Sequence, residues 1–284
     1  MTQEWNFLQE LVFNFGSELG KNPTQYMMEK AFGRHGLNWR YVQFEFGPEK
    51  LEDAVNAMRL LGFRGGNCTM PYKVSIIEHL DGLGESASLM GAVNCVVRRG
   101  DQLIGENTDG KGFLQSLLQV ADPAGKSVVV LGAGGAARAI AVELALAGVR
   151  ALTIVNRGEE RGQELARLLR EEVNVKTNFV RWQGDFTVPD STDVLVDATS
   201  IGMLDADARV PLDVDSLRPE MVVADVIIDP PDTRLIRDAR ERGATALDGL
   251  GMVVNQAVIA FKYWTEVDPD PEVMRSALKE VLGG

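Results

Sequence analysis

The sequence contains few of the residues that build metal sites, disulfide frameworks or histidine-dependent catalytic triads. Its 284 residues include two cysteines, Cys68 and Cys95, and two histidines, His35 and His79. The cysteines lack the spacing of metal ligands and are too few for a disulfide framework, so we expect reduced, buried thiols. Two histidines leave little room for a zinc site or a histidine-based triad, and we expect no bound metal.

Long apolar runs and an excess of basic charge are also absent. No apolar run approaches the roughly 18 residues that a membrane-spanning helix needs, and residues 1–10 contain neither a basic leader nor an apolar signal core. We therefore expect a cytoplasmic protein without membrane contact, either a monomer or a homodimer. The net charge of −12 argues against a nucleic-acid partner, which requires a basic face. The same acidity means that an anionic cofactor or substrate must be held by local positive charge.

The sequence does contain a long alternation of strand-like and helix-like segments. The first part of the chain predicts strands at 11–15 and 39–46 and helices at 23–33, 49–61 and 71–80. Further segments follow from Val128, with predicted strands at 152–155, 178–181, 194–197 and 221–227 and helices at 158–171 and 233–242. Such alternation implies a parallel sheet covered on both faces.

We therefore expect an α/β fold with two domains. Residues 1–112 form an N-terminal α/β domain, and residues 113–247 form a Rossmann-like, doubly wound parallel-sheet nucleotide domain. Residues 248–284 predict two further helices, one ending near Trp264 and a last amphipathic helix from Pro271 to Leu282, and these are too apolar to stand alone. We expect them to pack on the N-terminal domain and complete it.

The stretch 128–139, VVVLGAGGAARA, reads as a strand, a tight turn and the start of a helix. This order is the opening of a dinucleotide fold. Gly132 would permit the turn, and Gly134 would let the backbone approach a pyrophosphate at the positive end of the helix dipole. A glycine turn without a ligand is the alternative, but the next predicted strand begins at the distance that a nucleotide fold requires.

The end of that next strand bears on the choice of cofactor. An acidic residue there would bind the ribose 2′-hydroxyl of NAD and repel a 2′-phosphate. The chain instead has Asn156 followed by Arg157, which can pair with a phosphate, and Arg161 adds a second guanidinium one helical turn later. These residues favour NADP over NAD. Glu159 and Glu160 lie nearby, so the alternative is a solvated, charged helix start without specificity.

Lys73 and Asp109 are the candidate acid–base pair. A lysine can donate a proton to a developing alkoxide if burial lowers its pKa, and a nearby aspartate can orient the ammonium group. Hydride transfer to a ketone needs little more, since the cofactor performs the redox step. On spacing alone the simpler interpretation is that both are ordinary surface charges in turns.

Six segments, read together and in order, resemble the shikimate dehydrogenase family. They lie between residues 11 and 265 and read Asn67-Cys68-Thr69-Met70-Pro71-Tyr72-Lys73, Gly91-Ala92-Val93-Asn94, Asn107-Thr108-Asp109-Gly110, Asn156-Arg157, Asp197-Ala198-Thr199-Ser200-Ile201-Gly202-Met203, and Gly249-Leu250-Gly251-Met252 with Gln256-Ala257. The resemblance implies NADP-linked reduction of 3-dehydroshikimate to shikimate, a cyclic hydroxy acid. It places the reaction in a cleft between an N-terminal substrate domain and the nucleotide domain.

The resemblance also assigns roles to individual residues. Lys73 and Asp109 become the catalytic pair, and Thr69, Asn94 and Gln256 become contacts to the substrate hydroxyls, with Asn67 supporting their loop. The pyrophosphate would be cradled by Gly132, Ala133, Gly134, Gly135 and Ala136. Asn156 and Arg157 would take the adenosine phosphate end, and the nicotinamide would be bordered by Thr199, Met203, Gly249 and Met252.

Three positions depart from the family pattern. The family's Ser-x-Ser-Pro, whose hydroxyls bind the substrate carboxylate, aligns with Gly20-Lys21-Asn22-Pro23, in which both hydroxyls are gone. Asn22 offers an amide there, and Thr24 could reach in from the first helical turn. Ile228 stands where the family has a tyrosine, and Asp197 replaces an asparagine. Quinate or another cyclic hydroxy acid is therefore an alternative substrate. A non-catalytic nucleotide-binding regulatory protein is the alternative to an enzyme.

Overall fold

The computed structural model of the chain describes residues 7–283, which form two compact units. Unit 1 contains the residues up to Thr108 and those from Ala257 onward, and unit 2 is Asp109–Gln256. The sequence predicts the first boundary four residues later, after 112, and the second nine residues earlier, before 248. The difference has a packing cause: a Cβ at Gly110 would meet the carbonyl of Ala139, and one at Gly112 would lie 2.6 Å from the carbonyl of Met252. Residues 109–117 are thereby held within unit 2.

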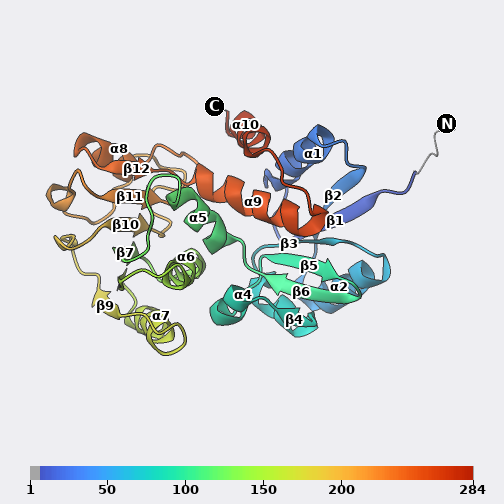
Figure 1. Ribbon diagram of the computed structural model, residues 1–284, viewed down its shortest axis with the longest axis horizontal. Coiled ribbons are helices and arrows are strands. Elements are labelled where there is room, and N and C mark those ends of the chain that lie inside the picture. The colour runs from blue at the N-terminus through green and yellow to red at the C-terminus, as the bar shows by residue number, and fades with distance from the viewer. Residues whose placement is uncertain (1–6, 284) are drawn as a thin grey trace. The chain divides into compact units, whose positions relative to one another are not determined.

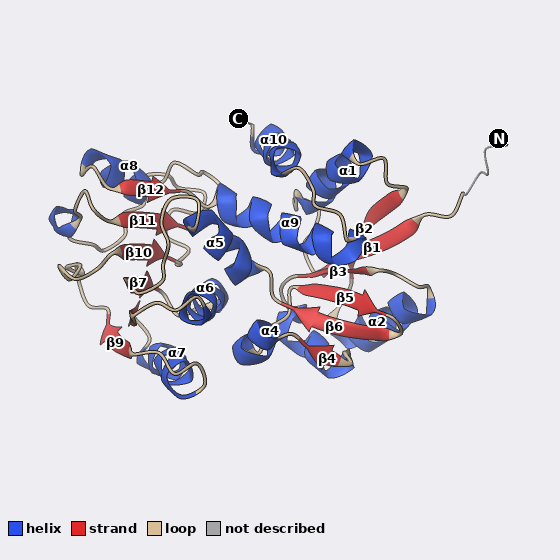
Figure 2. Cartoon of the chain, in the orientation of Figure 1, coloured by secondary structure: helices blue, strands red, loops and turns tan. Residues whose placement is uncertain are grey.

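Unit 1 is built on a mixed six-stranded sheet with the order β2-β1-β3-β5-β6-β4. Its first three strands are mutually parallel, whereas β5 runs antiparallel to both β3 and β6, as the opposed arrows of β5 and β6 show in Figure 2. Its elements are β1 (Glu10–Gly16), α1 (Thr24–Arg34), β2 (Trp39–Glu45), η1 (Pro48–Lys50), α2 (Leu51–Leu60), β3 (Gly65–Cys68), α3 (Tyr72–Ser75), η2 (Ile76–His79), β4 (Gly82–Leu83), α4 (Glu85–Met90), β5 (Cys95–Arg99), β6 (Gln102–Glu106) and α10 (Pro271–Leu282).

Unit 2 contains a fully parallel six-stranded sheet with the order β12-β11-β10-β7-β8-β9. Figure 1 shows β12, β11, β10 and β7 side by side in this order. Its elements are α5 (Asp109–Leu117), β7 (Ser127–Leu131), α6 (Gly135–Leu146), β8 (Ala151–Asn156), α7 (Glu159–Glu171), β9 (Thr177–Arg181), β10 (Val194–Asp197), η3 (Val214–Ser216), β11 (Val222–Asp225), α8 (Arg234–Glu241), β12 (Thr245–Leu247) and the first part of α9 (Leu250–Thr265). The predicted α/β class and Rossmann-like sheet are confirmed.

Each unit has its own apolar core. In unit 1, aromatic side chains of β1 pack against α2, with Phe13 and Val55 fully or almost fully buried. In unit 2, strand residues such as Leu195 and Val223 are fully buried beneath α8. Both cysteines are buried free thiols, as predicted. Among residues 7–283, no helix is long and apolar enough to cross a bilayer.

The strand β3 is the main element of the fold that the sequence pattern does not predict. Its residues, Gly-Gly-Asn-Cys, have no apolar alternation and resemble a turn. The structure places them between β1 and β5, where a Cβ at Gly66 would collide with Phe13 and one at Gly65 with the carbonyl of Val96. The glycines are therefore required because neighbouring groups approach the strand closely.

Candidate active site

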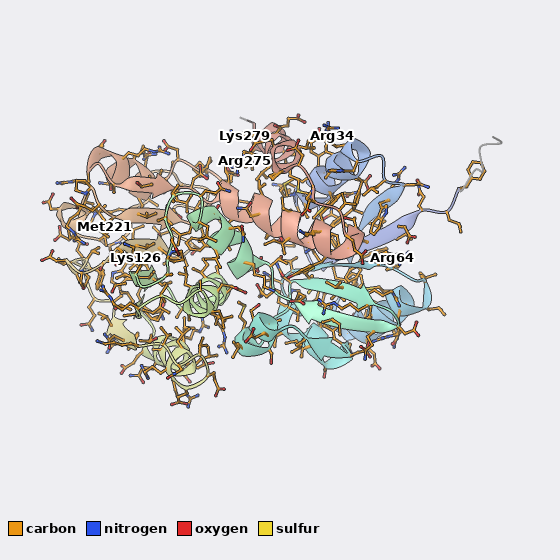
Figure 3. The ribbon with its side chains drawn as sticks, viewed as in Figure 1. Arg34, Arg64, Lys126, Met221, Arg275 and Lys279 are labelled. Atoms are coloured by element: carbon orange, nitrogen blue, oxygen red, sulfur yellow. The ribbon has the colours of Figure 1, made fainter. Side chains whose placement is uncertain are left out.

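A hollow of about 480 Å³ opens within unit 2 at the carboxyl ends of its strands. It lies where the chain, after extending the sheet through β8 and β9, returns to place β10 on the other side of β7. Ligands of open α/β sheets bind at such switch points. Lys126 and Met221, labelled in Figure 3, precede β7 and β11 and so mark the opposite, amino end of this sheet.

The glycine loop forms one wall of the hollow. Gly132 has a φ of +106°, and a Cβ there would lie 3.1 Å from the carbonyl oxygen of Ala198, so a side chain is excluded on both counts. The helix α6 then begins at Gly135, after an N-cap at Gly134 that supplies no side-chain hydrogen bond. The amide groups of the first helical turn have no partner within the helix and favour an anion.

Two arginines form the rim of the hollow beside the end of β8. Arg157 and Arg161 are exposed, and neither is ion-paired within the part of the chain that the structure describes. Glu159, which weakened the prediction for NADP, instead lies 3.8 Å from Arg181 and accepts a hydrogen bond from Gln163. The guanidinium groups remain available to a phosphate. The two arginines suit the 2′-phosphate of NADP. The hollow also contains Asn156 and the glycine loop.

The opposite wall is the segment that follows β10. The carboxylate of Asp197 accepts a hydrogen bond from the amide of Thr199 (3.0 Å), whose hydroxyl in turn accepts one from the amide of Ile201 (3.1 Å). Asp197 is fully buried, and burial raises its pKa to about 7, with a further contribution from the neighbouring Asp225 carboxylate. Asp197 thus fixes the wall that lines the cofactor hollow.

Seven of the twelve predicted cofactor residues line this hollow: Gly132, Ala133, Gly134, Asn156, Arg157, Arg161 and Thr199. The other five lie elsewhere in unit 2. Gly135 and Ala136 start α6, Met203 is exposed after β10, Gly249 lies against the carbonyl of Ile227, and Met252 lies on α9. Their roles stay predictions.

Six residues of the hollow were not among the predicted cofactor residues. Ala198, Ser200 and Ile201 belong to a segment of the family resemblance, whereas Trp182, Gly184 and Pro211 were missed entirely. Trp182 directly follows β9, and its indole N–H donates to the carbonyl of Pro211 at 2.9 Å. Its position after the third strand of a nucleotide fold was the available signal. Pro211 comes from a separate loop, and no local pattern links it to the site.

Lys73 and Thr69 are held by the loop that joins β3 to α3 in unit 1. The amide of Thr69 donates to the carbonyl of Phe15 (2.9 Å), and the carbonyl of Lys73 accepts from the amide of Val93 (2.7 Å). Asn67 supports the same loop, since its amide oxygen accepts from the Tyr41 hydroxyl at 2.8 Å. Both Thr69 and Lys73 are partly exposed, as a substrate contact requires.

Asn94 is buried and joins two of the predicted segments. Its side-chain oxygen accepts from the amide of Thr108 (2.7 Å), and its side-chain nitrogen donates to the Thr108 hydroxyl (3.0 Å). Thr108 directly precedes Asp109, so Asn94 fixes the point at which the chain leaves unit 1. Its predicted contact with the substrate remains a prediction.

Asp109 and Gln256 both belong to unit 2. Asp109 is the first residue of α5, and Gly112 of the same helix lies against the amide of Gln256, so α5 and α9 approach closely. Asn22, in unit 1, uses its side-chain oxygen to accept from the amide of Thr24 at 2.9 Å. The helix α1 begins at Thr24 with Pro23 as its N-cap, one residue later than the predicted start. Lys73 and Asp109 lie in different units, and their pairing stays a prediction.

Comparison with known proteins identifies this arrangement. Three family models match the chain: the shikimate dehydrogenase substrate-binding domain at residues 15–96, shikimate/quinate 5-dehydrogenase at residues 115–202, and the shikimate 5-dehydrogenase C-terminal domain at residues 249–279. The shikimate dehydrogenase (NADP(+)) of Desulforamulus reducens is 38% identical over 279 residues, covering 96% of this chain and 95% of the relative.

Two solved structures are similar over nearly the whole chain. The ligand-free 5-ketofructose reductase of Gluconobacter sp. strain CHM43 shares 47% identity with a TM-score of 0.95, covering 97% of this chain and 100% of the other. The shikimate 5-dehydrogenase of Thermus thermophilus, in complex with NADP(H) and shikimate, shares 31% identity with a TM-score of 0.82, covering 96% and 100%. The position of the hollow, the six sequence segments in the family's order and these similarities all point to the same family. The chain belongs to the shikimate dehydrogenase family.

Proposed function

We propose that this chain is an NADP-dependent oxidoreductase of the shikimate dehydrogenase type, acting on 3-dehydroshikimate or a related ring ketone. The oxidoreductase class and the NADP cofactor, both predicted from the sequence, are confirmed by the family. The observation that carries the proposal is the hollow in unit 2, in which the glycine loop and two unpaired arginines suit the phosphates of NADP. We further propose a cytoplasmic location.

The proposed mechanism assigns the proton transfer to Lys73 and Asp109. Bound NADPH supplies the hydride that reduces the ketone carbon. Lys73, on the short helix α3, donates a proton to the oxygen that becomes the alcohol, and Asp109 orients the ammonium group. In the reverse direction the same lysine, in its neutral form, accepts the proton. Thr69, Asn94 and Gln256 would bind the other hydroxyls and set the orientation of the ring.

Reduction of an uncharged keto-sugar is a second candidate function. It is favoured by the loop after β1, in which Gly20 and Asn22 replace the two hydroxyls that the family resemblance assigns to carboxylate binding. It is also favoured by the high similarity to a 5-ketofructose reductase. Such a substrate presents a ketone and hydroxyls but no carboxylate. The proton transfer by Lys73 and Asp109 would be the same for either substrate.

A substrate panel tests the proposal. Purified protein is supplied with NADP⁺ and shikimate or quinate, and separately with NADPH and 3-dehydroshikimate or 5-ketofructose, while the absorbance of the reduced cofactor is followed. Turnover of a ring acid supports the first candidate, and turnover of the ketose alone supports the second. NADP binding without turnover of any of the four would instead identify a non-catalytic nucleotide-binding protein.

A further inference from the structure

The loop between β1 and α1 already contains a carboxylate of the protein itself. Glu45 is the last residue of β2 and pairs with Gly16, the last residue of β1, so its side chain starts at the carboxyl end of the sheet. Its Oε1 accepts hydrogen bonds from the amide of Leu19 and from the amide of Gly20, the latter at 3.1 Å. A carboxylate of the chain therefore occupies the position that backbone amides would offer to a bound anion.

Two further backbone amides of this segment also have partners within it. The amide of Asn22 donates to the carbonyl of Leu19 (2.8 Å), and the amide of Thr24 donates to the side-chain oxygen of Asn22 (2.9 Å). Gly20 brings no side chain that could add a donor. A substrate carboxylate placed here would have to displace Glu45 or remain without these hydrogen bonds, and desolvation without compensation is unfavourable.

This loop borders the proposed substrate site. A Cβ at Gly16 would lie 2.6 Å from the side chain of Leu19 and 2.8 Å from the Cγ2 of Thr69. Leu19 and Thr69 are therefore adjacent, and the carboxylate that binds the Leu19 amide lies beside a predicted contact to the substrate hydroxyls. The Oε2 of Glu45 is bonded by no donor among residues 7–283, so it can accept a hydrogen bond from a ligand hydroxyl.

We infer that Glu45 is a specificity-determining residue that selects uncharged polyhydroxy ketones and disfavours substrates whose carboxylate would enter the β1–α1 loop. The inference rests on the proposed NADP-linked reduction at this site and, of the two candidate substrate classes, favours the second, the uncharged keto-sugar. A hydroxyl can donate to Glu45, whereas a carboxylate can only accept and carries the same charge. Lys21 is the one cation of the loop, and it is exposed at the surface, where a single flexible ammonium group contributes little.

The test compares two ligands that differ in one charge. Binding of shikimate and of its uncharged methyl ester is measured by calorimetry on protein saturated with NADPH, a combination that cannot react because both partners are already reduced. We expect the wild-type protein to bind the ester at least as tightly as the acid. In Glu45→Gln the new amide can still accept from Leu19 and Gly20 and can donate to the ligand. Its affinity for the acid should rise by roughly tenfold, with less than a twofold change for the ester.

Two further variants sharpen the result. Glu18→Gln removes an exposed carboxylate from the same loop and should leave the ratio of the two affinities within about twofold of the wild type, since distant exposed charges are screened. Gly20→Ser adds a hydroxyl where a Cβ meets no atom within 4 Å, and combined with Glu45→Gln it should increase acid binding further. A wild-type preference for the acid, or an equal change for both ligands in Glu45→Gln, overturns the inference alone. Failure of both ligands to bind any variant also overturns the inference, whereas the proposed function is decided separately by turnover in the substrate panel.

Discussion

The two units place a loop at the same topological position and use it differently. In each unit the first strand of a parallel segment, β1 or β7, ends in a loop that leads into a helix. In unit 2 the loop at Gly132–Gly134 receives no side-chain cap, and its amides face a hollow. In unit 1 the amides of Leu19 and Gly20 are occupied by Glu45.

The difference shows that topology supplies amide donors but side chains decide what they bind. Both loops could hold an anion on backbone geometry alone. One lies beside two unpaired arginines, and the other beside a carboxylate of the chain. On the proposed function, the anionic cofactor would bind in unit 2, and the loop of unit 1 would bind groups that donate hydrogen bonds.

The largest expected effect separates chemistry in unit 1 from cofactor binding in unit 2. Lys73→Ala should lower kcat/KM by about 10²- to 10⁴-fold, because the proton donor is lost. The Kd for NADP, measured by fluorescence titration, should change less than about twofold. Lys50→Ala, which removes an exposed lysine from the same unit, is the control and should keep full turnover. If Lys73→Ala weakened NADP binding by the same factor as it lowers kcat/KM, proton transfer and cofactor binding would not be divided between the two units.

The next effect concerns the pH dependence of stability. Unit 2 buries the carboxylate of Asp197, whereas the Glu45 carboxylate of unit 1 is exposed. The pKa of Asp197, about 7, is above its ordinary value, so between about pH 4 and pH 7 the folded chain keeps a proton that the unfolded chain has lost. Stability should therefore fall as pH rises through this window, by at most about 1.4 kcal/mol per pH unit, and this contribution should be constant above it.

Asp197→Asn should remove that slope. The variant keeps an oxygen that can accept from Thr199 but does not titrate. Urea unfolding near pH 5 and near pH 7 should show the stability of the variant, relative to the wild type, increasing with pH. A parallel pH dependence in the two proteins would mean that burial does not raise the pKa of Asp197.

A matched pair of glycine substitutions compares the two loops directly. Gly132→Ala should destabilise unit 2 by about 1–3 kcal/mol and weaken NADP binding, because of its positive φ and its contact with Ala198. Gly20→Ala should be neutral or slightly stabilising, because its Cβ meets open space and the unfolded chain loses freedom. Denaturant unfolding of both variants gives the two values. Similar losses at the two positions would show that the loops are equally constrained.

The smallest expected effect tests the charge at the rim of unit 2. Arg157→Ala should raise the Kd for NADP by roughly tenfold and leave the Kd for NAD unchanged, because only NADP has the phosphate that the arginine would pair with. Arg167→Ala, an exposed arginine of α7 outside the hollow, is the control. Equal effects on NADP and NAD would reject Arg157 as the 2′-phosphate ligand.

The sequence predicted those parts of the fold that have strong periodicity or local capping. The prediction agrees with the bounds of β10, Val194–Asp197, because a buried parallel strand is continuously apolar. It also agrees with the bounds of α10, Pro271–Leu282, because a proline follows the N-cap of this helix. The strand β3 was missed because its glycines are required by the close approach of neighbouring groups, so the strand lacks the alternation of apolar and polar residues that identifies a strand in a sequence. The segment 71–80, expected to be one helix, is divided into α3 and η2.

The site was predicted where a single segment carries it and missed where distant segments meet. Gly132 and Arg157 follow consecutive strands, so their places could be inferred from order alone. Pro211 joins the hollow through a bond from Trp182, 29 residues away in sequence. Glu45 contacts a loop 25 residues before it in the chain. Only coordinates reveal such pairings, because neither residue has an unusual local pattern.

Unit 1 consists of two stretches of the chain separated by unit 2, and this discontinuity has a consequence for folding during synthesis. The N-terminal part of unit 1 packs against its C-terminal part. Phe32 stacks on Phe261, the indole N–H of Trp264 donates to the carbonyl of Val96, and the Tyr26 hydroxyl donates to Glu280 at 2.6 Å. Unit 2 is encoded entirely before those partners appear. The part of unit 1 that precedes unit 2 in the chain consequently lacks these partners until residues 257–284 have been made, and a nascent chain that stops before them would contain an incomplete unit 1.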